Sequence, residues 1–182
     1  MRKKIINSKP LHIPFDNKTH ELYCNVDVTD PLDFQYTNGV TLTGIWDTGS
    51  EGCLISAELA EKLKLSPVGM KKVIGVHDEK WSPEYLLNLK LPNDESFEMI
   101  NVLVGDMIGS DEILIGMSIF TQGDFAVTNV NNSTAMSFRT PSVLRINYVT
   151  DQEKAIKEEE AYNRRQRKDT KRSQKGRKRR RR

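Results

Sequence analysis

The residues best suited to chemistry in this 182-residue chain are those at positions 47 to 50, which read Asp-Thr-Gly-Ser. They directly follow an apolar stretch from Leu42 to Trp46, which has the character of a buried strand. A carboxylate on a tight turn that contains glycine is held rigidly, and nearby backbone N–H groups can fix its orientation. Such a carboxylate is suited to acid–base chemistry on a water molecule.

A second element of related character lies further along the chain. Ile113-Leu114-Ile115-Gly116 is an apolar strand that ends in glycine. Taken alone, it is as well explained as a simple buried strand. The alternative for Asp47 is an ordinary β-turn, because Asp, Thr, Gly and Ser are all common turn residues. The order and spacing of the two elements favour the catalytic interpretation of Asp47.

Together, the two elements resemble the retropepsin-like family of single-lobed aspartic proteases, over residues 10 to 142. The resemblance implies a mainly β lobe, closed like a barrel and carrying one or two short helices, that hydrolyses peptide bonds. It implies that Asp47 is catalytic and is supported by Thr48, Gly49, Ser50, Ile115 and Gly116. Thr48 would join two such turns by hydrogen bonds, and both glycines would permit close backbone approach. The Ser50 hydroxyl would donate a hydrogen bond towards the carboxylate.

The chemistry of this family needs two carboxylates, whereas the chain has a single Asp-Thr-Gly. One carboxylate is ionised and takes a proton from the bound water, and the other is protonated and hydrogen-bonds the scissile carbonyl. The two share one proton because neighbouring carboxylates cannot both ionise cheaply. The second must therefore be Asp47 of another copy, and a C2 homodimer brings the two turns face to face. No cofactor is expected.

Residues 71–81 lie where the family has a hairpin, the flap, that closes over the substrate. Opening for a polypeptide and closing to exclude water require a mobile tip, which Gly75 suits. The residues predicted to contact substrate are Ile74, Gly75, Val76 and His77. For His77 a solvent-exposed loop position is the simpler interpretation, because a pair of carboxylates needs no acid–base histidine.

The remaining acids, histidines and cysteines suggest no further chemistry. Asp106, Asp111 and Asp124 are interpreted as turn or surface residues, because none lies in an Asp-Thr-Gly or Asp-Ser-Gly context. The histidines and cysteines lack paired spacings such as C-x-x-C or H-E-x-x-H, so no metal site is predicted. Cys24 and Cys53 are expected to be free, buried thiols.

Alternation of apolar and polar residues predicts a β-rich domain between Leu11 and Val149. Two clear apolar faces are Leu22, Cys24, Val26 and Val28, and Tyr85, Leu87, Leu89 and Leu91. Over residues 97–104 two phases stay open: Phe97, Met99, Asn101 and Leu103, or Ile100, Val102 and Val104. Residues 56–65 break the alternation with a Ser cap and the pair Leu59 and Leu63, which predicts a short amphipathic helix. A further helical turn is predicted at residues 117–121.

Charge divides the chain unevenly. Residues 1 to 150 hold 13 Lys or Arg and 19 Asp or Glu, a net charge of −6, whereas residues 151 to 182 hold 15 and 6, a net charge of +9. This asymmetry marks a boundary near Thr150. We expect an N-terminal extension at residues 1–10, the protease-like domain at residues 11–150, and a charged, strongly basic tail at residues 151–182. The tail has too little apolar surface for a core, so it is expected to be helical or disordered.

No apolar run reaches the length of a signal peptide or a membrane span, so a cytoplasmic protein without a membrane partner is expected. Residues 164–182 would release counterions on contact with nucleic acid or another polyanion. Without aromatic residues such binding would be weak and unspecific, and a solvated tail is the alternative. Three functions follow: a homodimeric aspartic endopeptidase acting on an extended polypeptide, a catalytically silent peptide-binding or scaffold domain of the same fold, or a polyanion-binding protein acting through its tail. The intact Asp-Thr-Gly-Ser favours the first.

Overall fold

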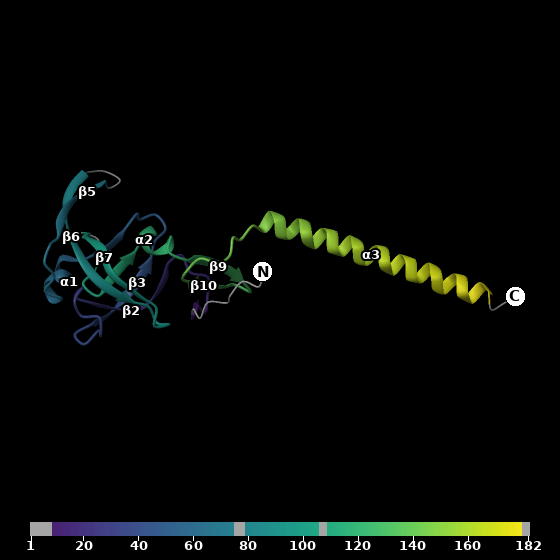
Figure 1. Ribbon diagram of the computed structural model, residues 1–182, viewed down its shortest axis with the longest axis horizontal. Helices are drawn as coiled ribbons and strands as arrows, with labels where there is room; N and C mark the ends of the chain where they lie inside the picture. Colours follow the sequence, from purple (N-terminus) through teal and green to yellow (C-terminus); the bar gives the residue numbers. More distant parts are fainter. Residues whose placement is uncertain (1–8, 75–78, 106–108, 180–182) are drawn as a thin grey trace. The chain divides into compact units, whose positions relative to one another are not determined.

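The computed structural model divides the chain into two compact units, Met1–Val143 and Leu144–Arg182. It describes residues 9–74, 79–105 and 109–179, and the side chains of these residues except those of residue 74 and residues 167–179. Figure 1 shows the elements of each unit. The strands of the first unit are β1 Leu11–Pro14, β2 Leu22–Thr29, β3 Val40–Trp46, β4 Cys53–Ile55, β5 Gly69–Ile74, β6 Glu79–Lys90, β7 Ser96–Val104, β8 Glu112–Ile115, β9 Asp124–Val130 and β10 Ser133–Arg139. Its helices are α1 Ala57–Lys62 and α2 Met117–Phe120, and the second unit contains α3 Tyr148–Arg179.

Seven strands of the first unit form one sheet in the order β2-β3-β8-β4-β7-β6-β5. Because β2 also pairs with β6 at Val28 and Leu89, the sheet closes on itself as a barrel. β5 stays outside this ring and pairs with β6 alone among the described strands. The mainly β, closed lobe with short helices that the sequence predicts is therefore confirmed.

The barrel interior follows the predicted alternation, with one change of phase. Val26 and Val28 of β2 and Leu87 and Leu89 of β6 are fully buried or nearly so. In β7, Phe97 is buried and Met99 is exposed, while Val102 is again buried. Of the first proposed phase only Phe97 is buried, and the second phase holds beyond Met99, where Val102 is the buried residue.

A pair of irregularities in β6 and β7 produces the change of phase. Met99 has a positive φ of 51°, and the register of β6 with β7 shifts between Leu87 and Leu89. Asn88, at the shift, is fully buried. Its side-chain oxygen accepts the Met99 N–H at 2.8 Å, and its side-chain nitrogen donates to the Asp30 carbonyl at 3.1 Å. The buried amide is therefore satisfied on both sides, which makes the bulge tolerable in the interior.

Both predicted helices are present. α1 is capped by the Ser56 hydroxyl, which accepts the Leu59 N–H at 3.1 Å, and it buries Leu59 and Ala60. An N-cap of this kind satisfies one of the backbone donors that a helix start leaves open. α2 begins immediately after Gly116 and buries Ile119 and Phe120.

An aromatic cluster fills the end of the barrel next to position 47. The ring of Trp46 lies 5.2 Å from that of Phe120, 5.6 Å from that of Phe125 and 5.1 Å from that of Phe138, measured between centroids. Its indole N–H donates to Cys24 Sγ at 3.3 Å, so the buried polar atom has a partner. The cluster joins the barrel strand β3 to α2 and to the smaller sheet, because each of these elements contributes a ring.

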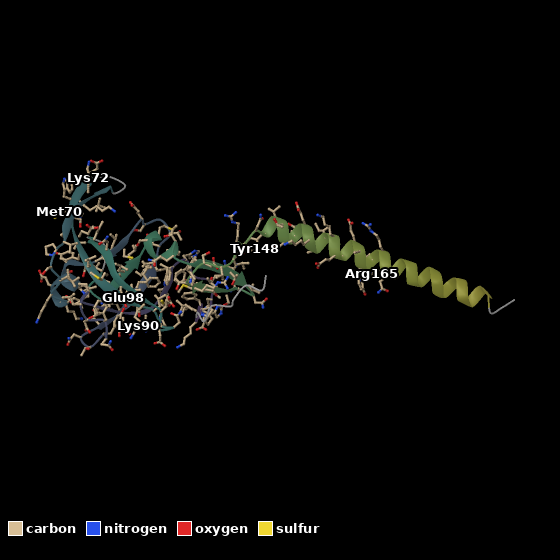
Figure 2. All side chains as sticks on the ribbon, in the orientation of Figure 1. Met70, Lys72, Lys90, Glu98, Tyr148 and Arg165 are labelled. Carbon is tan, nitrogen blue, oxygen red and sulfur yellow. The ribbon has the colours of Figure 1, made fainter. Side chains whose placement is uncertain are left out.

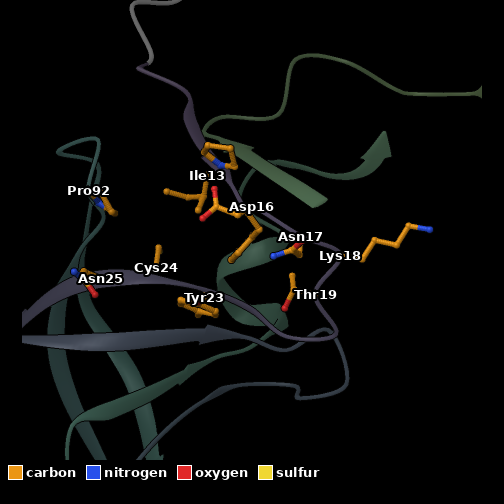
Figure 3. Close-up of a pocket in the computed structure, with 11 residues that line it drawn as sticks. Ile13, Asp16, Asn17, Lys18, Thr19, Tyr23, Cys24, Asn25 and Pro92 are labelled. Carbon is orange, nitrogen blue, oxygen red and sulfur yellow. The ribbon is translucent and has the colours of Figure 1, made fainter. Parts of the chain in front are cut away.

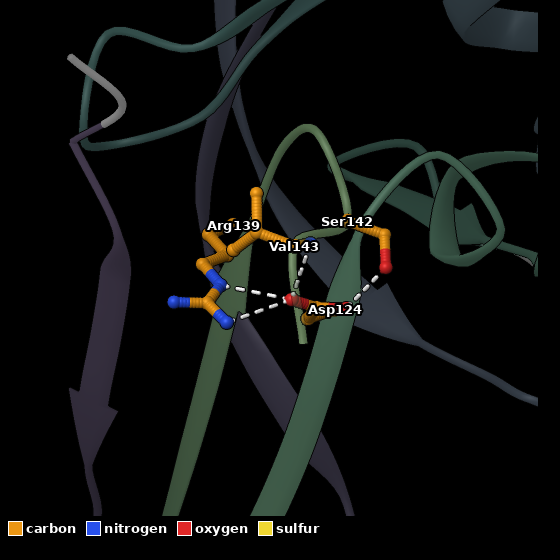
Figure 4. A network of polar contacts seen from close by, with 4 residues as sticks. All are labelled: Asp124, Arg139, Ser142 and Val143. Atoms are coloured by element: carbon orange, nitrogen blue, oxygen red, sulfur yellow. Dashed lines mark hydrogen bonds and ion pairs between the residues drawn. The ribbon is translucent and has the colours of Figure 1, made fainter. Parts of the chain in front are cut away.

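The smaller sheet has the strand order β1-β10-β9 and is held at its end by a partly buried ion pair. Arg139 donates to Asp124 Oδ2 from Nε at 2.9 Å and from Nη2 at 2.8 Å, and the Asp124 side chain is 14% exposed (Figure 4). The Ser142 hydroxyl and the Val143 N–H donate to the same carboxylate. Asp124 therefore fixes the segment that follows β10, and its interpretation as a turn or surface residue is wrong. Asp111 is exposed, as expected, and Asp106 lies outside the described residues.

The second unit is a single charged helix. Of the two alternatives for the tail, helix or disorder, the structure describes α3 from Tyr148 to Arg179. The side chains of Tyr148 and Arg165 project from this helix in Figure 2, and Tyr148 is 71% exposed. None of the described helices combines the length and the apolar composition that crossing a membrane would require.

Truncation of the aromatic cluster tests the packing of the lobe. We expect Phe138→Ala to lower the free energy of unfolding by about 3–5 kcal/mol, because Phe138 is 1% exposed and contacts Trp46. Val130→Ala is the control, since Val130 lies on β9 with 64% exposure and its truncation should cost within about 0.5 kcal/mol. Urea unfolding at one fixed protein concentration measures both values. Equal losses in the two variants would contradict the described core.

Candidate active site

The Asp47 turn connects two strands that lie on either side of a third. β3 enters the turn and β4 leaves it, and β8 runs between them, parallel to β3 and antiparallel to β4. Trp46 is level with Ile115 in this arrangement, and Leu54 is level with Leu114. The Asp47 N–H donates to the Ile115 carbonyl at 3.0 Å, so the ladder between β3 and β8 continues into the turn. Ile115 thus lies at the base of the turn and is hydrogen-bonded to it.

The carboxylate of Asp47 is oriented by the backbone of its own turn. The Gly49 N–H donates to Asp47 Oδ1 at 2.8 Å, and the Ser50 N–H donates to the Asp47 carbonyl at 3.3 Å. A Cβ at Gly49 would lie 3.1 Å from Asp47 Oδ1, which is tight. Asp47 is half-buried, whereas Thr48 and Gly49 are exposed. The turn therefore presents a fixed carboxylate oxygen beside an open backbone surface.

The far side of the turn rests on the start of α2. The Met117 N–H donates to the Ser50 carbonyl at 2.8 Å, and the Ser118 N–H donates to the Glu51 carbonyl at 3.0 Å. Gly116 makes this approach possible. A Cβ there would lie 2.6 Å from the Gly52 carbonyl carbon, nearer still to its oxygen, and 2.9 Å from the Ser50 oxygen. The structure thus brings Asp47, Thr48, Gly49, Ser50, Ile115 and Gly116 together at one place.

Comparison with known proteins identifies the family to which the segment around Asp47 is similar. Residues 34–119 match the family model described as aspartyl protease, and that stretch contains the turn, β8 and the start of α2. This segment of the chain belongs to the aspartyl protease family. No curated protein matches the chain with significance.

Several solved structures are similar to the chain at low sequence identity. A retropepsin-like aspartic protease from Rickettsia conorii is 18% identical with a TM-score of 0.49, covering 73% of this chain and 95% of that one. The EIAV protease in complex with the inhibitor HBY-793 is 16% identical with a TM-score of 0.42, covering 57% of this chain and 88% of that one. The simian foamy virus (mac) protease is 20% identical with a TM-score of 0.39, covering 54% of this chain and 91% of that one.

One detail of this aspartyl protease family turn differs from expectation. The Ser50 hydroxyl donates to the Gly52 carbonyl at 2.8 Å and not to the Asp47 carboxylate. A hydroxyl has one proton to donate, so in this conformation Ser50 shapes the exit of the turn instead of bonding the acid. The role of Thr48 between two turns stays a prediction, because it concerns a second copy.

The described residues of the predicted flap form two paired antiparallel strands, β5 and β6. β5 and β6 pair from Gly69 and Glu84 to Ile74 and Glu79. Ser82 anchors the hairpin to β7, because its hydroxyl donates to the Val104 carbonyl at 2.9 Å and accepts the Val104 N–H at 3.1 Å. The tip residues Gly75, Val76 and His77 lie outside the described residues, as does the side chain of Ile74.

A link between this hairpin and the active turn could not be found from the sequence pattern. Lys71 Nζ on β5 lies 3.7 Å from Glu51 Oε1, directly after Ser50. Lysines and glutamates are common on exposed hairpins and turns, so their presence does not predict a contact. In the sequence, one partner precedes α1 and the other follows it. With side-chain exposures of 50% and 90%, the pair contributes little to stability. It does place the flap strand within reach of the turn.

The two cysteines and a cavity beside the start of β2 do not include Asp47. Cys24 and Cys53 are free and buried, as predicted, and burial raises the pKa of both thiols, so they stay neutral. A cavity of about 710 Å³ lies between the loop after β1 and the start of β2, lined by Phe15, Asp16, Thr19 and Cys24 among others (Figure 3). It does not include Asp47. Within the described ranges, no cluster of three or more His, Cys, Asp or Glu could hold a metal ion.

Adding one methyl group at each of two neighbouring glycines tests the support of the turn. We expect Gly116→Ala to cost about 1–3 kcal/mol of unfolding free energy, because the new Cβ meets backbone atoms that cannot swing aside. Gly52→Ala is the matched control, since a Cβ there has no atom within 4 Å and should change stability by within about 0.5 kcal/mol. Chemical unfolding of the two variants side by side gives the comparison. A tolerated Gly116→Ala would contradict the close contact between turn and helix.

Proposed function

We propose that the protein is an aspartic endopeptidase whose active site forms when two copies meet at their Asp47 turns. The observation that carries the proposal is the fixed carboxylate: Gly49 holds one oxygen of Asp47 at 2.8 Å on a turn braced by Ile115 and Gly116. A catalytic acid needs this kind of pre-organisation, because correct geometry must exist before the reaction begins. Membership of the aspartyl protease family supports the same chemistry.

A second copy is proposed because one turn supplies one catalytic acid. The nearest other acid in the turn, Glu51, has a side chain that is 90% exposed and lies 3.7 Å from Lys71. It is therefore turned to the flap strand and not to Asp47. The sequence contains no second Asp-Thr-Gly. Twofold symmetry would bring an identical turn to the same place with no further requirement on the chain.

The proposed reaction uses the two acids in different protonation states. The ionised carboxylate takes a proton from the bound water as the water oxygen bonds to the scissile carbonyl carbon. The protonated acid gives its proton to the carbonyl oxygen, which yields a tetrahedral intermediate. When the C–N bond breaks, the acid that received the first proton transfers it to the leaving nitrogen. The other acid regains a proton from the intermediate, so that the pair again holds one proton.

The proposed substrate is an extended polypeptide that lies between the turns and the flaps. The proposed substrate site is at Asp47 and not in the cavity of about 710 Å³ described above, which does not include that residue. Among the described strands, β5 pairs only with β6 and is not part of the closed ring. The outer end of the hairpin can therefore move without opening the barrel. Contacts of Ile74, Gly75, Val76 and His77 with substrate, and a cytoplasmic location, stay predictions.

Removal of one carboxylate tests the proposal. We expect Asp47→Asn to lower kcat/KM on an unfolded protein substrate by at least about 10³-fold, because an amide can neither take up nor give the required proton. Asp111→Asn is the control, since it makes the same chemical change at an exposed turn before β8. It should leave the activity within about twofold. The initial rate of peptide-bond cleavage at mildly acidic pH is the measurement.

Two results would contradict the proposal. One is a wild-type protein that is inert at every pH and concentration while its unfolding transition shows an intact lobe. The other is an Asp47→Asn variant that cleaves as fast as the Asp111→Asn control.

A further inference from the structure

The second half of α3 combines a very high positive charge with a one-sided arrangement of that charge. Residues 163–179 contain ten Lys or Arg and one Asp, and no apolar residue. Residues 148–162 differ sharply, with five Asp or Glu and two Lys. The helix therefore changes from acidic to basic at its middle. This order also stabilises the helix, because acids near its start and bases near its end interact favourably with the helix dipole.

Helical geometry collects the basic residues on one side. With 3.6 residues per turn, nine of the ten fall within an arc of about 160° around the axis. These nine residues, which we call the cationic face, are Arg164, Arg165, Arg167, Lys168, Lys171, Arg172, Lys175, Lys178 and Arg179. The remaining arc holds Asn163, Gln166, Asp169, Thr170, Ser173, Gln174, Gly176 and the single exception Arg177. A tail selected only for solubility has no need of this order.

From this juxtaposition we propose that the cationic face binds the phosphate backbone of a nucleic acid. The face extends along the helix for about 22 Å, and a duplex presents one phosphate charge per about 1.7 Å of its axis. Nine cations on one side of this length therefore face several closely spaced phosphate charges. At the start of the face Arg164 is held by Glu160 at 2.9 Å, one turn earlier on the same helix.

Two other partners fit the same segment less well. A helix that lies on a membrane needs an apolar face opposite its basic one, whereas the opposite side of residues 163–179 holds polar residues, Gly176, Asp169 and Arg177 and no large apolar residue. A protein interface of ordinary stability has an apolar or aromatic centre, which this segment also lacks. A phosphate backbone requires neither feature. The absence of aromatic residues further predicts that the bases are not stacked, so binding should depend on salt and little on sequence.

Three full-length proteins test the proposal. The first is the wild type. The second, the neutralised variant, carries Lys168→Gln, Lys171→Gln and Lys175→Gln on the cationic face. The third, the relocated variant, adds Gln166→Lys, Thr170→Lys and Ser173→Lys on the opposite side, which restores the net charge. Glutamine and lysine both favour helix, and circular dichroism confirms that α3 is retained in each.

Fluorescence anisotropy measures binding to short single-stranded and duplex oligonucleotides of RNA and DNA, at salt concentrations from about 50 to 200 mM. We expect the neutralised variant to bind at least about tenfold more weakly than the wild type, with a salt slope smaller by about 2 to 3. The relocated variant should also bind more weakly than the wild type, because three of its positive charges no longer lie on the cationic face. The tightest of the four oligonucleotides identifies the type of nucleic acid.

Three results would overturn the proposal. The first is wild-type protein that binds none of the four oligonucleotides at about 50 mM salt. The second is a relocated variant that binds within about twofold of the wild type, since net charge alone would then explain binding. The third is tighter binding to anionic lipid vesicles than to every oligonucleotide at the same salt concentration.

Discussion

The Asp47 turn depends on one close backbone contact. The carbonyl groups of residues 50–52 pack against the start of α2. Gly116 is the residue that permits it, because any Cβ there would overlap the Gly52 carbonyl. β8 delivers Gly116 to this place from between β3 and β4. The position of Asp47 is therefore fixed by strands that enter the turn, leave it and pass beneath it. The barrel, closed by β2 and β6, keeps these three strands in register.

The aromatic cluster extends this support to the rest of the lobe. Trp46 precedes Asp47 and contacts Phe120, Phe125 and Phe138, which belong to α2, β9 and β10. A shift of α2 would thus disturb both the carbonyl contacts of the turn and the packing of Trp46. Asp124 also stabilises this region, because its carboxylate binds Arg139 and the backbone of the segment that follows β10. Packing and hydrogen bonding therefore oppose movement of the turn together.

Much of this arrangement could be predicted from local sequence. The Asp-Thr-Gly-Ser turn, the strand that ends in Gly116 and the helix capped by Ser56 each have a short signature whose physical cause lies within a few residues. The bulge at Met99 could not be predicted, because it depends on Asn88 of the neighbouring strand. The hydrogen bond from Ser50 to Gly52 and the ion pair of Asp124 with Arg139 were missed for a similar reason. Serine and aspartate have several possible partners, and the fold decides which of them is near.

In the proposed enzyme, one active site takes one Asp47 from each of two copies. The most direct measurement mixes wild-type protein with an equal amount of Asp47→Asn, allows the subunits to exchange, and follows cleavage at concentrations where activity per chain no longer rises. Half of the wild-type chains then pair with an inactive partner, so the account predicts that the activity falls to about half. Asp111→Asn in the same mixture should add activity of its own. Wild-type activity that is unchanged by the Asp47→Asn chain would contradict the claim, because each copy would then act alone.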